Sequence, residues 1–254
     1  MDRRVMRGPV IAGLLVLGAG AQAAPVSGQG TWETTLQGRD LDGVVTTYEA
    51  YYDTVLDITW LADANYARTS GYDSVGRMTW QAASDWAANL DVHGVTGWRL
   101  PTISPVNGSS YNTLYSPAGN TDLGYNISAA GTAYAGSTVS EMAHLFYNTL
   151  GNKGLYNTAG NVQSGWGLSN TGPFDLQAGA YWSGTDLSVS LAWLFSFSDG
   201  VQTYTDVSNF NLFAWAVRSG DVPVSGASVP IPAAGWLFGS ALLGLAGWAR
   251  RRAR

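Results

Sequence analysis

Hydrophobic and polar residues alternate in two parts of the chain, first after residue 30 and again in the last third. Such alternation is typical of strands with one buried face. It predicts one or two strands between Thr31 and Tyr52, separated by a turn at Asp42-Gly43, and then a strand that ends near a buried Trp60. Further strands are predicted at 181–185, 192–197, 201–204 and 213–218.

Turn and helix signals separate these strands. Asp199-Gly200 stands between two of the predicted strands and indicates a hairpin. The segment from Trp80 to Leu90 has the period of an amphipathic helix, with Thr79 in the N-cap position. Its predicted apolar stripe consists of Ala83, Trp86, Ala87 and Leu90.

A second helix is predicted from Val139 to about Leu150. Thr138 is its expected cap, Glu141 stands at the capping-box position, and Gly151 follows its end. The apolar side of this helix leaves His144 on the opposite side, so the sequence predicts an exposed histidine.

The stretches 103–136 and 152–180 are rich in Gly, Ser, Asn, Thr and Tyr and show no sustained period. Loops of this length inside a domain are usually functional or variable.

Arg99 lies after the first predicted helix, in Trp98-Arg99-Leu100. An arginine between two apolar residues is unusual for a chain with so few charges. A buried cation needs a partner, and the pattern favours a bidentate pair with Asp53, Asp57 or Glu141. The alternative is an arginine that binds an anion.

The first 23 residues have the layout of a secretory signal peptide. Three arginines precede a short apolar segment, and the small residues Ala21 and Ala23 then match the needs of a signal peptidase, with cleavage before Ala24. The alternative is an uncleaved anchor helix, but the apolar run is short for a bilayer and is interrupted by glycines.

The last 29 residues, 226–254, contain a prolyl motif, an apolar run and an arginine cluster. The motif is Val229-Pro230-Ile231-Pro232-Ala233, and the apolar run at about 233–249 is just long enough for a transmembrane helix. Arg250, Arg251 and Arg252 follow and should stay in the cytoplasm, which places the rest of the chain outside.

These three elements, in this order, resemble the PEP-CTERM sorting signals in the variant that reads Val-Pro-Leu-Pro-Ala, with Ile231 in place of Leu. The resemblance implies recognition by an exosortase, which removes the membrane helix. It further implies a protein of the cell envelope or extracellular matrix that is anchored in the cytoplasmic membrane only transiently. A plain C-terminal membrane anchor is the alternative.

Only 12% of the residues are charged, and the charge is unevenly distributed. Seven of the 13 basic residues lie in the two terminal segments, so the middle has six cations against 17 of the 18 acidic residues, a net charge of −11. Phosphate backbones would be repelled, which argues against nucleic acid as a partner. The chain has no cysteine, which excludes thiol catalysis and Cys-ligated metals.

The body, residues 24–225, resembles the Lcl C-terminal-like domain of unknown function. The resemblance rests on Thr59-Trp60-Leu61, Met78-Thr79-Trp80, Gly97-Trp98-Arg99-Leu100-Pro101-Thr102, Tyr181-Trp182-Ser183-Gly184-Thr185 and Ala214-Trp215-Ala216-Val217-Arg218. It implies an α+β fold similar to C-type lectins and the formylglycine-generating enzyme, with an antiparallel sheet, two helices and long loops. The oxidase activity of the latter needs cysteines, and the sugar-binding loop motifs of calcium lectins are absent from this sequence.

The sequence shows no catalytic constellation, and we expect neither an enzyme nor a bound cofactor. The two histidines of the chain, His93 and His144, lie in no nucleophile–base pattern. Four acidic residues of the loops could supply oxygen ligands to calcium: Asp122, Asp175, Asp186 and Asp206. No loop has the spacing of an EF-hand.

Binding is the remaining class of function. Aromatic rings on polar loops can stack on sugars while amides bond the hydroxyl groups. The candidate ligand-binding residues are Trp166, Tyr111, Tyr115 and Tyr125, with Tyr156 as a further loop aromatic. We therefore expect a non-enzymatic module that binds an extracellular polysaccharide. The alternatives are a structural matrix protein without a specific ligand and an unrecognised hydrolase.

Overall fold

The computed structural model describes residues 23–44 and 46–222. The predicted signal segment up to residue 22, the sorting motif Val229–Ala233, the expected membrane helix and the arginine cluster lie outside the described residues. Among those that are described, no helix combines the length and the apolar character needed to span a bilayer.

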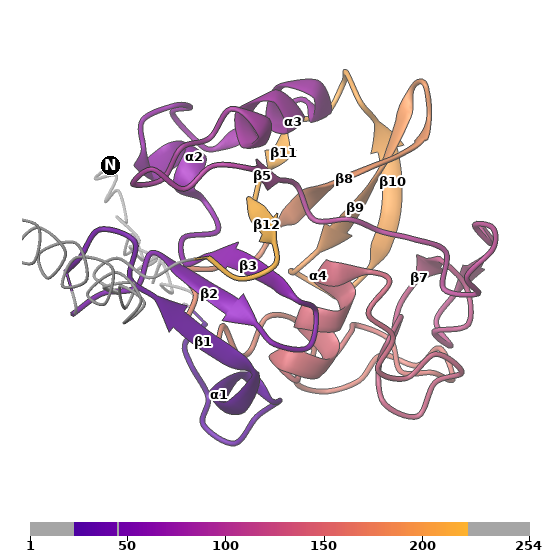
Figure 1. Ribbon diagram of the computed structural model, residues 1–254. Helices are drawn as coiled ribbons and strands as arrows, with labels where there is room; N and C mark the ends of the chain where they lie inside the picture. Colours follow the sequence, from indigo (N-terminus) through magenta and orange to yellow (C-terminus); the bar gives the residue numbers. More distant parts are fainter. Residues whose placement is uncertain (1–22, 45, 223–254) are drawn as a thin grey trace, which may run out of the picture.

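A five-stranded antiparallel sheet forms one side of the body (Figure 1). Its order is β1-β2-β3-β12-β5, so the last strand in the sequence lies inside the sheet, between two early ones. The bounds are β1 Leu36–Arg39, β2 Ala50–Asp53, β3 Ile58–Leu61, β12 Val217–Ser219 and β5 Trp98–Arg99. The strands predicted between Thr31 and Trp60 are therefore confirmed, although Trp32–Thr35 is a helical turn, α1.

The second sheet has seven strands in the order β4-β11-β8-β9-β10-β7-β6. The β11–β8 and β6–β7 pairs are parallel and the others are antiparallel. The bounds are β4 Arg77–Met78, β11 Leu212–Phe213, β8 Ala180–Ser188, β9 Leu191–Ser196, β10 Gln202–Asp206, β7 Leu123–Gly124 and β6 Tyr115–Ser116. The predicted hairpin around Asp199-Gly200 is confirmed as β9–β10. The expected antiparallel sheet is thus present, and the strands β8, β9 and β10 form the centre of a second, mixed sheet beside it.

The helices of the described residues are few and short. The predicted first helix is confirmed as α3 (Trp80–Ala88), which follows the four-residue α2 (Tyr66–Thr69) and has Thr79 at its N-cap without a side-chain capping bond. With these elements, the described residues form an α+β body built mostly from sheet.

The second predicted helix differs from expectation in its cap and its exposure. It begins as α4 (Glu141–His144) and continues as a π-helical turn, η1 (Leu145–Thr149). Ser140, not Thr138, is the cap, since its Oγ accepts from the Ala143 N–H. His144 is buried at 5% exposure, because the loop before the helix covers it and Ser137 presents a carbonyl oxygen 3.1 Å from its Nδ1.

An aromatic core joins the two sheets. Trp60, Trp182, Trp193 and Trp215 are fully buried. Trp215 lies on the short segment between β11 and β12, so the chain passes there from the second sheet into the first (Figure 1). Its ring is 4.7 Å from that of Trp60, and its indole N–H donates to the Leu61 carbonyl oxygen at 2.8 Å.

Arg99 forms the bidentate ion pair that the sequence indicated, and Glu141 is the partner. The guanidinium donates at 2.8 and 2.7 Å to the two carboxylate oxygens. The Thr102 N–H donates to the same carboxylate at 2.6 Å. The Glu141 side chain is only 10% exposed. The pair therefore fastens β5 to the start of α4 across 42 residues of sequence.

We predict that Glu141→Gln lowers the free energy of unfolding by roughly 2 kcal/mol, because it leaves a half-buried guanidinium without its counter-charge. Chemical denaturation measures the change. Asp221→Asn is the matched control, since it breaks an ion pair whose carboxylate side chain is 47% exposed, and the expected loss there is below about 1 kcal/mol. Equal losses in both variants would contradict this account of Glu141.

Candidate functional site

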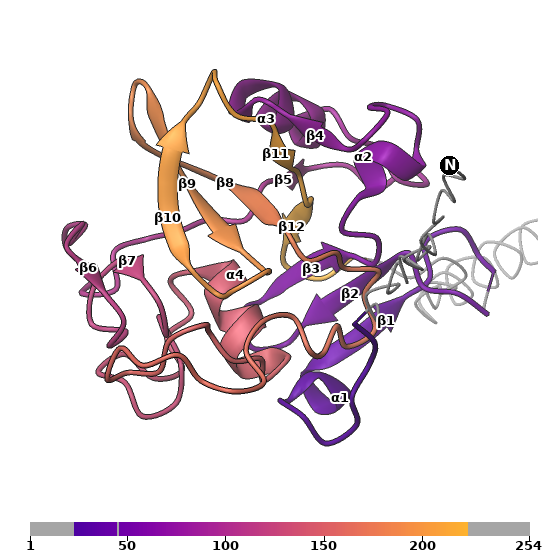
Figure 2. The same ribbon diagram turned by 180° about the vertical axis from the view of Figure 1, so that it is seen from behind.

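The two long loops fold against each other beside β6 and β7 (Figure 2). In the second of them, antiparallel bridges Lys153↔Gly167 and Tyr156↔Val162 form a structure that we call the 153–167 hairpin. The Gly167 N–H donates to the Lys153 carbonyl oxygen at 2.8 Å, and the Gln163 side-chain amide donates to that of Gly154 at 2.7 Å. The hairpin is thus held by its own backbone and amides rather than by an apolar core.

Asn126 fastens this hairpin to the first loop. Its Nδ2 donates to the carbonyl oxygens of Pro117 and Tyr156, at 2.7 and 2.8 Å, and its backbone N–H donates to the Tyr147 hydroxyl at 2.9 Å. The residue has a φ of +60°, in the left-handed region that asparagine tolerates better than most residues. The bonds from a single buried side chain therefore determine how the two loops meet.

Three tyrosine rings form a row across the junction of the two loops. Tyr115 and Tyr125 meet edge to face at 6.4 Å, and Tyr125 and Tyr156 at 5.2 Å. Tyr115 is 59% exposed, whereas Tyr125 is buried and donates its hydroxyl to the Asp199 carboxylate at 3.0 Å. Burial first, and then the Asp199 charge, raises the pKa of Tyr125. Tyr125 therefore supports the row, while Tyr115 presents a ring to solvent.

The other two candidate aromatics lie in different places. Trp166 belongs to the 153–167 hairpin and is 46% exposed. Tyr111 packs against the ring of Trp193 at 5.3 Å and donates its hydroxyl to the Ile103 carbonyl oxygen, so it belongs with β9. The structure brings Tyr115, Tyr125 and Tyr156 together and places Trp166 in the same hairpin as Tyr156. Tyr111 is not part of this group.

An open cleft of about 350 Å³ lies among the same loops. Its lining is almost entirely amides, hydroxyls and small side chains, contributed by Asn126, Ala129, Ala130, Tyr147, Asn152, Lys153, Asn157, Thr158 and Gln163. We call it the amide cleft. The single cation in its lining is Lys153, which is also the only lysine of the chain. The sequence did not single out Lys153 or Asn126, although the uniqueness of the lysine was a usable signal.

The histidines show no nucleophilic arrangement within the described residues. His93 is exposed, at a φ of +52°, in a turn. His144 contacts a backbone carbonyl oxygen, that of Ser137, through its Nδ1. The fully buried Asp53 carboxyl has its pKa raised by burial, and its Oδ1 accepts the N–H groups of Val55 and Leu56. These two bonds stabilise the backbone turn that follows Asp53.

Three carboxylates, of Asp40, Asp42 and Glu49, lie within 4.8 Å of one another in the loop between β1 and β2. Each accepts a backbone N–H: Gly43 donates to Asp40, Val44 to Asp42, and Leu41 to Glu49. None of the loop acids named from the sequence as calcium ligands belongs to this cluster. Asp122, one of those acids, is buried and accepts the N–H groups of Val106 and Asn112.

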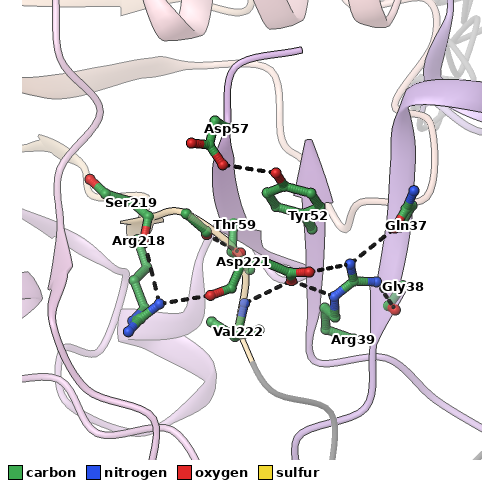
Figure 3. Close-up of polar contacts among 11 residues, drawn as sticks. Gln37, Gly38, Arg39, Tyr52, Asp57, Thr59, Arg218, Ser219, Asp221 and Val222 are labelled. Carbon is green, nitrogen blue, oxygen red and sulfur yellow. Dashed lines mark hydrogen bonds and ion pairs between the residues drawn. The ribbon is translucent and has the colours of Figure 1, made fainter. Parts of the chain in front are cut away.

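A network around Asp221 fastens the end of the described chain to the five-stranded sheet (Figure 3). Arg39 donates to both Asp221 oxygens, at 2.6 and 2.8 Å, and Arg218 donates to the Asp221 carbonyl oxygen at 3.0 Å. We call this group the Asp221 clasp. The bond from Arg39 lowers the pKa of Asp221, so the clasp is fully formed above the ordinary carboxyl pKa and is lost only as the pH falls through the lowered one. The clasp thus fixes the last described residues to the five-stranded sheet.

No protein-family model matches the chain, and no curated protein sequence matches it either. The functional inference therefore depends on the residues themselves.

We predict that Asn126→Ala lowers the free energy of unfolding by about 2–3 kcal/mol, because it removes two side-chain bonds and leaves alanine at a positive φ. Hydrogen exchange should accelerate across the 153–167 hairpin. Asn126→Gly is the control, since glycine tolerates this φ and loses only the side-chain bonds. We expect it to lower the free energy of unfolding by less than Asn126→Ala does. Unchanged exchange in both variants would show that Asn126 does not hold the hairpin.

Proposed function

We propose that this chain is an exported, non-enzymatic protein of the cell surface or extracellular matrix whose long loops bind a polysaccharide. The observation that carries the proposal is the exposed aromatic side chains of Tyr115 and Trp166 on the same two loops that line the amide cleft. A structural matrix role or hydrolysis of the glycan are outcomes that the experiments below would reveal.

The chemistry of the loops supports a sugar ligand. A pyranose has apolar C–H faces that stack on aromatic rings and hydroxyl groups that need donors and acceptors. In the cleft lining, Asn157 supplies its amide N–H groups and Gln163 its amide oxygen, since the other half of each amide bonds the hairpin backbone, and Lys153 adds a donor. The open form of the cleft suits a polymer that passes across it better than a small molecule enclosed by it.

The fold we propose is similar to C-type lectins. The α+β body, the chain end inserted within a sheet and the long irregular loops support it. The tryptophans of the motifs that resemble the Lcl C-terminal-like domain are mostly buried, as in Trp60, Trp98 and Trp215. These tryptophans pack the core of the body, so we assign ligand binding to residues of the loops.

The two ends of the chain support export and sorting. Signal peptidase would cut before Ala24, and an exosortase would recognise Val229–Ala233 and remove the following helix. The Asp221 clasp holds the chain eight residues before Val229, the first residue of the motif. No nucleic acid or cofactor enters this proposal, and membrane contact is through the tail before sorting.

We predict that Trp166→Ala weakens glycan binding by about tenfold or more, because an exposed ring that stacks on a sugar supplies a large share of the affinity. A glycan array identifies the ligand for the full chain in nonionic detergent, and titration measures the affinity. Phe210→Ala is the matched control, since Phe210 is 50% exposed outside the two loops. Flat signals on all glycans would refute the proposal, and release of shorter glycans during incubation would show a hydrolase instead.

We predict that the mature protein, isolated from a host with an exosortase, begins at Ala24 and ends between Val229 and Ala233. Intact-mass spectrometry measures both ends. Replacement of Pro230 and Pro232 by alanine should leave the tail attached, because the enzyme would lose its prolyl motif. A wild-type chain that still ends at Arg254 in such a host would show a plain membrane anchor.

A further inference from the structure

The cations of the body divide into two groups of three. Arg39 and Arg99 form bidentate ion pairs, and Arg218 donates to backbone carbonyl oxygens. The charged groups of Arg68, Arg77 and Lys153 make no hydrogen bond or ion pair with any described residue. Lys153 lines the amide cleft. Arg68 and Arg77 line a different cleft together.

This second cleft, the arginine cleft, has a volume of about 450 Å³. It is lined by Asn65, Arg68, Ser74, Val75, Arg77, Gln177 and Phe213. In a body with a net charge of −11, this lining contains two arginines and no carboxylate. Two unpaired guanidiniums that share a cleft repel each other, so the arrangement favours a negatively charged occupant.

The backbone and an aromatic ring position Arg77. It lies on β4 directly opposite Phe213 of β11, and its Cζ is 4.3 Å from the centre of that ring. Phe213 is itself only 6% exposed and stacks on Tyr181 at 5.1 Å. A guanidinium over an aromatic face keeps its N–H donors free in its own plane. Arg77 is thus pre-oriented without consuming its donors.

Arg68 reaches the cleft from the last turn of α2, and the turn before β4 is folded closely against it. Asp73 Oδ1 accepts the N–H groups of Val75, Gly76 and Arg77, which fixes this turn. A side chain at Gly76 would collide with Asn65 and lie 3.2 Å from the Arg68 Cβ. Glycine, at a φ of +71°, is what allows the two arginine-bearing elements to approach.

The carboxylates near the cleft are already bonded to other groups. Asp73 serves the turn, as described, and those backbone bonds lower its pKa. Asp175 accepts the Gln177 side-chain amide at 2.8 Å. Neither lies within 4 Å of an arginine nitrogen in an ion pair, unlike Asp221 and Glu141. The two guanidiniums therefore remain available to a ligand.

We propose that the arginine cleft is a second binding site, specific for an oxyanion. The group is a carboxylate or sulfate on an acidic sugar residue, or the free phosphate or sulfate ion, since all of these accept bidentate N–H bonds from guanidinium. The site is independent of the aromatic loops and holds whether or not those loops bind a neutral glycan.

The test is isothermal titration of the full chain in nonionic detergent at low salt with phosphate, sulfate, glucuronate and glucuronate methyl ester. Saturable binding of the anions without binding of the neutral ester is expected. Glucuronate binding tighter than the inorganic ions would assign the site to an acidic sugar, and equal affinities would assign it to a free oxyanion. Modification of arginine with phenylglyoxal, read by mass spectrometry, should show that the ligand protects Arg68 and Arg77 but not Arg218.

Arg68→Gln and Arg77→Gln should each weaken anion binding by about tenfold. Val189→Glu is the control, because it lowers the net charge by the same one unit at a fully exposed turn residue outside the cleft, and its affinity should stay within about twofold. An equal loss in Val189→Glu would overturn the proposal in favour of general charge attraction. Absence of saturable anion binding, or of protection at both arginines in the wild type, would overturn it whatever the variants' stability.

Discussion

Trp215 is the point on which the two-sheet body depends. The chain leaves the seven-stranded sheet at Phe213 and enters the five-stranded sheet at Val217, so the three residues between them must serve both. Trp215 is completely buried there and contacts rings from both sides, those of Trp60 at 4.7 Å and Phe197 at 5.8 Å. Its indole N–H bond to Leu61 removes the cost of burying a polar group. A smaller residue would leave a cavity at the only place where this segment crosses between the sheets.

Two further indoles, those of the partly buried Trp80 and the fully buried Trp182, bond to neighbouring elements in the same way. Trp80 donates to the Ser183 carbonyl oxygen and Trp182 to that of Met78, both within 2.9 Å. These bonds tie α3, β4 and β8 together reciprocally. The recurrent tryptophan motifs of this sequence are thus explained by packing and, for Trp80, Trp182 and Trp215, by indole bonds to backbone carbonyl oxygens. These contacts account for the motifs without a ligand, so a ligand-binding role falls to residues that the motifs do not include.

The sequence predicted what depends on local pattern. α3, the β9–β10 hairpin and an acidic partner for Arg99 follow from period, turn residues and the cost of an unpaired cation. The errors come from the paths of the loops. His144 lies off the apolar stripe, but the loop directly before the helix, ending at Ser137, folds over that side, and the helical period does not reveal the path of a loop. For the same reason the sequence could not tell the exposed Tyr115 from the buried Tyr125, since the loop partners of each ring are far away in the chain.

The distribution of cations connects the fold to the proposed sites. A body with a net charge of −11 repels anionic polymers at long range. Anions can bind only where short, directional bonds outweigh that repulsion, which requires donors that the protein has not already used. Arg39, Arg99 and Arg218 are consumed in holding elements together. The three remaining cations, Arg68, Arg77 and Lys153, line two clefts among the described residues, and these clefts contain the cationic donors that the fold leaves unused there. Neutral sugars meet no such barrier, and aromatic loops with amides between them are suited to that wider class.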